Sequence, residues 1–286
     1  MSWRKETTDA VDGEVSLDPE GEDAQGEGIG EFLVTLAVAF AIAFAIRGFV
    51  IEPFRIPSGS MFPTLLIGDH LFVNKFVYGP RIPFTDIRLP GLREPERGDV
   101  VVFEVGRLTD APPGRDIVPI DRRPDARRED FVKRIVGLPG DLIEVRDEQL
   151  FVNHEPVSAV PLDRTFIDPQ NTELDVYEET LGECMHGVVD DPGKATTGRT
   201  PFVVEEGRYF MMGDNRDNSN DSRVWGTVRI EEFKGPAFII YWSWNSKGNF
   251  FHLLNPINWF TVEKRWDRVF DLIRCGAVDR VTRAGG

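Results

Sequence analysis

Pro57-Ser58-Gly59-Ser60-Met61-Phe62-Pro63-Thr64 separates two unlike parts of the chain, a long apolar run before it and a series of strand-like segments after it. Glycine permits a tight backbone and proline fixes its neighbours, so the stretch predicts a rigid turn that projects a serine side chain. A serine nucleophile needs such a position, with backbone N–H groups facing the attacked carbonyl. Taken alone, the stretch is more typical of an ordinary turn.

The apolar run at 29–51 predicts a transmembrane anchor. Between Phe32 and Ile46 there is no charged residue, and one helix from Phe32 to Ile51 would reach roughly 30 Å, the thickness of the hydrocarbon layer. Arg47 lies near one end, where its stem can reach the interface. A buried core helix and a cleaved signal peptide are the alternatives. The acidic flank before the run disfavours a signal peptide, and the flanking charges leave the orientation open.

Composition limits the remaining possibilities. The chain has 286 residues and a net charge of -15, with no basic stripe to neutralise phosphates, which argues against a nucleic-acid partner. Cys184 and Cys275 have no metal-like spacing, so we expect no metal and no cofactor, and whether the two cysteines pair is open. Residues 1–28 are acidic and poor in large apolar side chains, which predicts a disordered tail.

Beyond residue 70 the sequence predicts a mainly β, antiparallel domain, because short segments rich in β-branched and aromatic residues are bounded by Gly, Pro or Asp. The expected strands are 70–76, 99–105, 131–138, 141–145, 149–152, 208–212, 224–230 and 238–242. Turns are expected at 138–141 and 146–149.

Two stretches interrupt the strands, a Pro- and Arg-rich one at 106–130, expected to be an exposed loop, and an acidic one at 153–200. We therefore divide the region after the anchor into a catalytic β domain at 52–152 and 201–260, an inserted subdomain at 153–200 and a C-terminal segment at 261–286. Residues 262–275 of that segment can form a helix.

A serine nucleophile needs a base, and Lys133 is the stronger candidate. Side chains alternate across a strand, so Lys133 and Arg134 face opposite sides. If Phe131, Lys133 and Ile135 share the inward face, Lys133 lies in apolar surroundings while Arg134 reaches water. Burial penalises the ammonium and lowers its pKa, so a neutral amine can take the serine proton. Taken alone, a Lys-Arg pair on a strand is more typical of a solvated face.

A histidine base is the alternative. His70 begins a strand and can reach Ser60, which keeps a Ser–His site open. The other histidines, His154, His186 and His252, lie in polar or loop-like surroundings and are interpreted as surface residues.

A polar loop follows the strand at 208–212: Gly213-Asp214-Asn215-Arg216-Asp217-Asn218-Ser219-Asn220-Asp221-Ser222-Arg223. Asn and Asp side chains accept hydrogen bonds from nearby backbone N–H groups, so the loop can be rigid without a hydrophobic interior. Asp221 can pair with Arg223, and Ser219 can hydrogen-bond the lysine amine. A solvated loop and a calcium loop are the alternatives, but the carboxylate spacing does not follow the helix–loop–helix calcium pattern.

Together these segments resemble the type I signal peptidases, bacterial leader peptidases that use a Ser–Lys dyad. The matching segments are 57–65, 133–141 and 213–223, with a weaker match at 98–103. The resemblance implies a membrane-bound endopeptidase without a cofactor, whose partners are preprotein signal peptides and the lipid bilayer. It also implies a single-pass protein of the bacterial cytoplasmic membrane, with the catalytic domain on the extracytoplasmic side. The oligomeric state is open.

The resemblance also implies roles for individual residues. Ser60 is expected to be the nucleophile, Lys133 the general base, Ser58 an oxyanion-hole donor beside the N–H of Ser60, and Ser219 the residue that orients the lysine. Asp221, Arg223 and Asp214 are expected to support the site. The residues expected to line pockets for small side chains, hence cleavage after a small-x-small sequence, are Phe54, Ile56, Pro57 and Val132. Two alternatives are a Ser–Lys protease that matures few substrates and a non-catalytic, membrane-tethered β domain that binds exported proteins.

Overall fold

The computed structural model describes residues 24–80, 85, 87–146, 148–194, 201–244 and 264–276. The chain divides into two units, Met1–Ala45 and Ile46–Gly286. The helix α1 (Ala24–Phe49) begins in the first unit and ends in the second.

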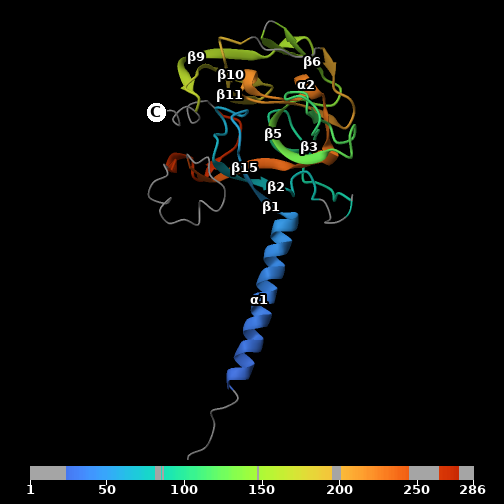
Figure 1. The fold of residues 1–286 in the computed structure, drawn as a ribbon, viewed down its shortest axis with the longest axis vertical. Coiled ribbons are helices and arrows are strands. Elements are labelled where there is room, and N and C mark those ends of the chain that lie inside the picture. Colours follow the sequence, from blue (N-terminus) through green and yellow to red (C-terminus); the bar gives the residue numbers. More distant parts are fainter. Residues whose placement is uncertain are drawn as a thin grey trace, which may run out of the picture. The chain divides into compact units, whose positions relative to one another are not determined.

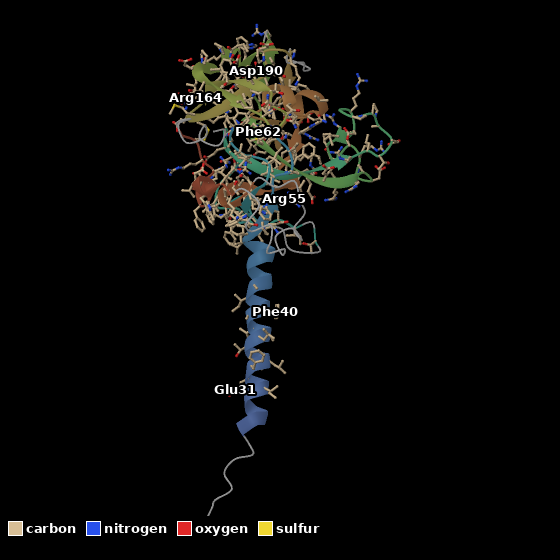
Figure 2. The ribbon with its side chains drawn as sticks, turned by 60° about the vertical axis from the view of Figure 1, so that its left-hand side comes forward. Glu31, Phe40, Arg55, Phe62, Arg164 and Asp190 are labelled. Carbon is tan, nitrogen blue, oxygen red and sulfur yellow. A yellow bond between two sulfur atoms is a disulfide. The ribbon has the colours of Figure 1, made fainter. Side chains whose placement is uncertain are left out.

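The helix α1 begins five residues before the expected start of the anchor at 29, and it exposes large apolar side chains. Phe32, Phe40 and Ile42 are 63%, 67% and 55% exposed, and Figure 2 shows Phe40 pointing away from the helix axis. Within the described ranges, no helix meets the length and apolarity needed to cross a bilayer. The anchor at 29–51 stays a prediction, and residues 1–23 of the expected tail lie outside the described residues.

The second unit is built on a nine-stranded antiparallel sheet in the order β1-β2-β15-β3-β5-β13-β14, with β16 added to β15 and β4 to β3. Figure 1 shows β1, β2 and β15 lying side by side. The strands are β1 (Ile51–Arg55), β2 (Asp69–Asn74), β3 (Val100–Arg107), β4 (Ile117–Val118), β5 (Arg127–Gly137), β13 (Arg208–Met212), β14 (Val228–Arg229), β15 (Phe233–Ser243) and β16 (Asp271–Leu272).

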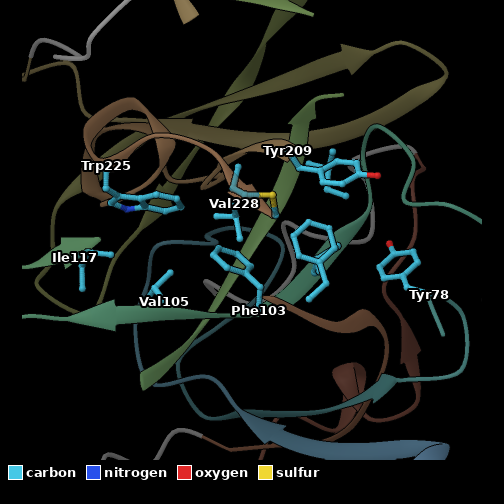
Figure 3. Packing of buried hydrophobic residues seen from close by; sticks show 11 residues of the cluster. Tyr78, Phe103, Val105, Ile117, Tyr209, Trp225 and Val228 are labelled. Atoms are coloured by element: carbon cyan, nitrogen blue, oxygen red, sulfur yellow. The ribbon is translucent and has the colours of Figure 1, made fainter. Parts of the chain in front are cut away.

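Strands β3 and β5 are covered on both faces at the centre of this sheet. Along β3, Val101 and Phe103 belong to one apolar cluster, while Val100 and Val102 belong to another, as alternation across a strand requires. Figure 3 shows the first cluster, in which Phe103 lies near Val105 and Val228. At the centre of the sheet, side chains on both faces of these two strands are therefore buried, whereas the start of β5 is exposed.

Two smaller antiparallel sheets complete the second unit. A four-stranded sheet contains β12 (Phe202–Val203), β6 (Leu142–Arg146), β7 (Gln149–Val152) and β8 (Glu155–Pro156). A three-stranded sheet, called the inserted sheet below, contains β9 (Ser158–Ile167), β10 (Glu173–Leu181) and β11 (Cys184–Asp190). The predicted subdomain at 153–200 thus supplies a sheet of its own, although its β8 pairs with β7 of the four-stranded sheet.

Seven of the eight expected strands are confirmed within a few residues, and the turns at 138–141 and 146–149 are present. The strand at 224–230 is wrong, because this stretch holds α2 (Ser222–Trp225), β14 and the start of the 3-10 helix η2 (Ile230–Glu232). The helix at 262–275 is wrong over the described residues 264–276, which form the 3-10 helix η3 (Trp266–Arg268) and β16. The stretch 106–130 is only partly a loop, since β4 lies within it and Ile117 and Ile120 are buried.

The two cysteines form a disulfide bond, Cys184–Cys275, which settles the question that the sequence leaves open. Cys184 begins β11, and Cys275 follows β16. The bond therefore ties the inserted sheet to the C-terminal described segment, across a sequence separation of 91.

Candidate active site

Ser60 and Lys133 meet, although 73 positions separate them in the chain. Lys133 Nζ donates a hydrogen bond to Ser60 Oγ at 2.6 Å and a second one to the carbonyl oxygen of Val132 at 3.1 Å. Lys133 is only 3% exposed, and burial lowers its pKa to about 8, although Asp221 and Asp214 oppose the shift. An amine with this pKa is partly neutral near physiological pH, as a general base must be.

The turn that carries Ser60 is held by a hydrogen bond within it and by two more from the polar loop. Within it, the N–H of Phe62 donates to the carbonyl of Gly59 at 3.1 Å. A Cβ atom on Gly59 would lie 2.4 Å from the ring of Phe62, so only glycine fits there. From outside, Asn215 donates its backbone N–H to the carbonyl of Ser60 at 3.1 Å and its side-chain amide to the carbonyl of Gly59 at 3.0 Å. The polar loop therefore clamps the turn directly, a role for Asn215 that sequence reasoning missed.

A cavity of about 770 Å³ opens beside the serine and the lysine. The expected pocket residues all line it, and Ser58 is exposed on its wall. These lining residues are Phe54, Ile56, Pro57, Ser58, Val132 and Ser219. The cavity also has lining that the sequence analysis did not assign to a site, notably Val224, which is 43% exposed and directly follows the polar loop. Val224 is the first apolar residue after this polar run, and that position is the signal that could have identified it.

Asp221 and Arg223 pair as expected, through two hydrogen bonds of 2.8 Å each. Asp221 also accepts the N–H of Gly213 at 3.0 Å. A Cβ atom on Gly213 would lie 2.3 Å from Ser219 Oγ and 2.4 Å from the carbonyl oxygen of Ser60. The ion pair therefore holds the loop at Gly213, where a larger residue would overlap both Ser219 and Ser60.

Ser219 lies in the cavity wall beside Lys133, but the expected hydrogen bond between them is not formed. The Ser219 hydroxyl is buried, and Lys133 Nζ donates instead to Ser60 and to the Val132 carbonyl. Ser219 packs against Gly213, and Gly213 also lies against the backbone of Ser60. This packing holds Ser219 close to the turn that carries Ser60.

Arg134 does not reach water, which corrects the expectation for the outer face of its strand. It is 2% exposed and binds Asp214, itself 1% exposed, through two hydrogen bonds of 2.7 and 2.8 Å. Despite burial, Arg134 holds the pKa of Asp214 below its usual value. The physical reason is that β5 has a second interior on that side, which contains Thr64, another hydrogen-bond partner of Asp214.

Over the described residues, the hydroxyl of Ser60 is paired with Lys133 and not with a histidine. His70 packs against the rings of Tyr241 and Trp244, and Ser60 Oγ is held by the lysine. His154 is an exposed surface residue, but His186 is buried, so its assignment to the surface is wrong. His252 lies outside the described residues. Over the described ranges, no three His, Cys, Asp or Glu side chains are grouped as metal ligands would be.

The three segments are therefore brought together as the resemblance implies. A family model described as "Signal peptidase, peptidase S26" matches residues 29–242. The chain belongs to this family. The signal peptidase I of Pseudomonas fluorescens is 39% identical over 71% of this chain and 69% of its own length, and that of Pseudomonas aeruginosa is 36% identical over the same shares. The signal peptidase I of Rickettsia typhi is 32% identical over 80% of this chain and 88% of its own length.

The family is that of the S26 serine peptidases, so the chain is an enzyme with signal peptidase I activity, which cleaves signal peptides from secreted preproteins. The resemblance inferred from the motifs is confirmed, and so is the mainly β, antiparallel fold of the catalytic part. Signal peptidase activity excludes the alternative of a purely binding domain.

Proposed function

We propose that Ser60 is the nucleophile of this signal peptidase and that Lys133 is its general base. The observation that carries the proposal is the 2.6 Å contact between Lys133 Nζ and Ser60 Oγ, made by an amine that is 3% exposed. The neutral amine takes the hydroxyl proton while Ser60 Oγ attacks the scissile carbonyl carbon. The ammonium of Lys133 then returns the proton to the leaving amine of the substrate. The neutral amine of Lys133 next activates the water that hydrolyses the ester between Ser60 and the substrate.

The oxyanion of the tetrahedral intermediate needs donors on the cavity side of Ser60. We assign this role to the N–H of Ser60 and the hydroxyl of Ser58. Ser58 is exposed on the cavity wall, two residues before the nucleophile, so its hydroxyl is free to rotate towards the carbonyl. Ser219 is proposed to orient the lysine once substrate fills the cavity, while Asp214, Asp221 and Arg223 hold the loop that carries it.

Substrate is proposed to bind as an extended strand. Over the described residues, β1 pairs only with β2, and β5 pairs with β13 only from Arg134 onward. Both strands therefore present backbone groups beside the cavity, which is the requirement for adding a peptide strand. The apolar walls supplied by Phe54, Ile56, Pro57 and Val132 favour small side chains before the cut, hence a small-x-small site.

The enzyme is proposed to be a single-pass protein of the bacterial cytoplasmic membrane, with its catalytic part outside. The exposed apolar side chains of α1 and the bacterial relatives support membrane anchoring. The disulfide between Cys184 and Cys275 supports the extracytoplasmic side, because such bonds persist in oxidising compartments. The bilayer would place the enzyme beside the signal peptides that it cuts.

The test uses the full-length protein in detergent, a preprotein with an Ala-x-Ala site, and N-terminal sequencing of the product. Ser60→Ala and Lys133→Ala should each reduce cleavage by roughly a thousandfold or more, because dyad members act as a unit. Lys194→Ala changes an exposed surface lysine and serves as the matched control. If the Lys133→Ala enzyme cleaves at the wild-type rate, Lys133 is not the general base. Cleavage of one preprotein among many would instead support the specialised-protease alternative.

A further inference from the structure

The inserted sheet covers the back of the segments that carry Ser60. Phe62, in the turn that carries Ser60, packs into an apolar cluster with Phe166, Val176 and Val189 of this sheet, and the ring centres of Phe62 and Phe166 are 5.0 Å apart. The backbone contact is equally direct, since the N–H of Val189 donates to the carbonyl of Asp214 at 2.9 Å. The sheet is therefore in contact with both the nucleophile turn and the polar loop.

A buried ion pair lies in this contact. Glu179, on β10, is 2% exposed, and its Oε1 lies 2.7 Å from Arg216 Nη2 in the polar loop. Its partner in register on β11 is His186, whose Nε2 lies 3.3 Å from the same oxygen. Although burial opposes ionisation, Arg216 and His186 hold the pKa of Glu179 well below its usual value, so it is a carboxylate.

Stability alone does not explain a carboxylate at this position. A buried ion pair costs desolvation that its attraction often fails to repay, and apolar replacements of such pairs are frequently as stable. The neighbouring inward positions of β10, Leu174, Val176 and Leu181, are apolar, and a similar residue at 179 would continue their pattern. What the carboxylate adds is a fixed position for Arg216.

From Arg216, four successive contacts lead to the backbone of Ser60. The carbonyl oxygen of Arg216 accepts a hydrogen bond from Arg223 Nη2 at 2.6 Å. Arg223 holds Asp221 through two hydrogen bonds, and Asp221 accepts the N–H of Gly213. Gly213 in turn lies against the backbone of Ser60, the proposed nucleophile. Each link is a charge-assisted or backbone hydrogen bond, or a close packing contact, so a shift of Arg216 displaces the loop at Gly213.

We propose that Glu179 is a positioning residue for catalysis, which holds the polar loop in register with Ser60 through its ion pair with Arg216. The inserted sheet thereby takes part in the peptidase reaction without touching the substrate. This inference rests on the proposed roles of Ser60 and Lys133. A displacement of about 1 Å at a reacting group can reduce the rate by up to a hundredfold, which sets the scale of the expected effect.

The experiment measures kcat and KM of the full-length enzyme in detergent, with a peptide that spans an Ala-x-Ala site, well below the unfolding temperature. Glu179→Gln is expected to lower kcat tenfold or more and to change KM less than twofold. Arg216→Gln should do the same, and the double variant should be no slower than the slower single variant, because both changes break one link. Glu173→Gln, at the exposed start of the same strand, is the matched control and should behave as wild type.

Two results would overturn the inference. One is a Glu179→Gln enzyme with a lowered unfolding temperature but a kcat within twofold of wild type, as a purely structural residue would give. The other is a double variant whose loss is the product of the two single losses. If Glu179→Gln does not fold, Glu179→Asp decides, since it keeps the charge but retracts it by one methylene: a threefold or larger fall in kcat supports positioning, and an unchanged kcat refutes it.

A Lys133→Ala enzyme measured alongside separates this inference from the proposed mechanism. If Lys133→Ala cleaves at the wild-type rate, the dyad itself is wrong. If Lys133→Ala is inactive while Glu179→Gln is unaffected, only the positioning role fails.

Discussion

The buried amine of Lys133 makes a quantitative prediction about pH. With a pKa of about 8, the neutral fraction is about 9% at pH 7, about 50% at pH 8 and about 91% at pH 9. If only the neutral amine takes the proton from Ser60, kcat/KM should rise about fivefold from pH 7 to pH 8 and less than twofold from pH 8 to pH 9. A lysine with its ordinary pKa would instead give a steady rise of about tenfold per pH unit up to pH 9.

The assay is cleavage of a peptide substrate that has no group titrating between pH 6 and pH 10, with enzyme folding checked at each pH. Asp190 needs a control, because burial and its hydrogen-bonded neighbour Asp217 raise the pKa of Asp190 to about 7. An Asp190→Asn enzyme removes this group and should keep the midpoint near pH 8. A midpoint that disappears in Asp190→Asn, or a profile that falls as pH rises from 6 to 8, would refute the assignment of the base to Lys133.

Three further predictions concern stability and packing around the site. Lys133→Met should abolish cleavage but raise the free energy of unfolding at pH 7 by up to about 3 kcal/mol, because the unfolded state binds the lysine proton more tightly than the folded state, whose pKa is about 8; equal or lower stability in urea titrations would show that the amine is not strained by burial. Gly213→Ala should lower kcat at least tenfold and lower the free energy of unfolding by about 1–3 kcal/mol, since its Cβ would overlap Ser219 and Ser60. A folded variant with wild-type kcat in steady-state kinetics would contradict this contact. Reduction of the bond between Cys184 and Cys275 should lower the free energy of unfolding by up to about 4.6 kcal/mol, because the bond closes a loop with a sequence separation of 91. Reductant should therefore lower the unfolding temperature of the wild type, but not that of a Cys184→Ser/Cys275→Ser enzyme.

Much of the site could be predicted because its chemistry is carried by short contiguous segments. The serine turn, the lysine strand and the polar loop each have a composition that explains their local structure, and strand alternation correctly placed Lys133 on an inward face. The contact between Asp221 and Arg223 is similarly local, since two positions separate them. Strands bounded by Gly, Pro or Asp were also found where expected, apart from the segment after Arg223, where the N-cap Asp221 starts a short helix instead.

The groups that sequence reasoning missed act through contacts between distant segments. Glu179 and His186 lie in an acidic, mixed stretch whose composition suggests a solvated excursion, yet the inserted sheet buries both. Nothing local to His186 distinguishes it from the exposed His154. The burial of each depends on which face of the inserted sheet meets the polar loop, and that face is set by tertiary packing.

Adjacent cations on β5 show how the fold gives similar residues opposite functions. Alternation sends Lys133 and Arg134 to opposite faces, but both faces are interiors, so each cation loses its water. Arg134 meets a carboxylate in bidentate geometry and keeps its charge, which anchors the loop at Asp214. Lys133 meets a hydroxyl and a carbonyl, neither of which compensates a buried ammonium, so its pKa falls. The group that faces each cation therefore decides which one keeps its charge and supports the structure, and which one can serve as the proposed base. A carboxylate within hydrogen-bonding distance of Nζ would restore the lysine charge and, by the same physics, stop the reaction.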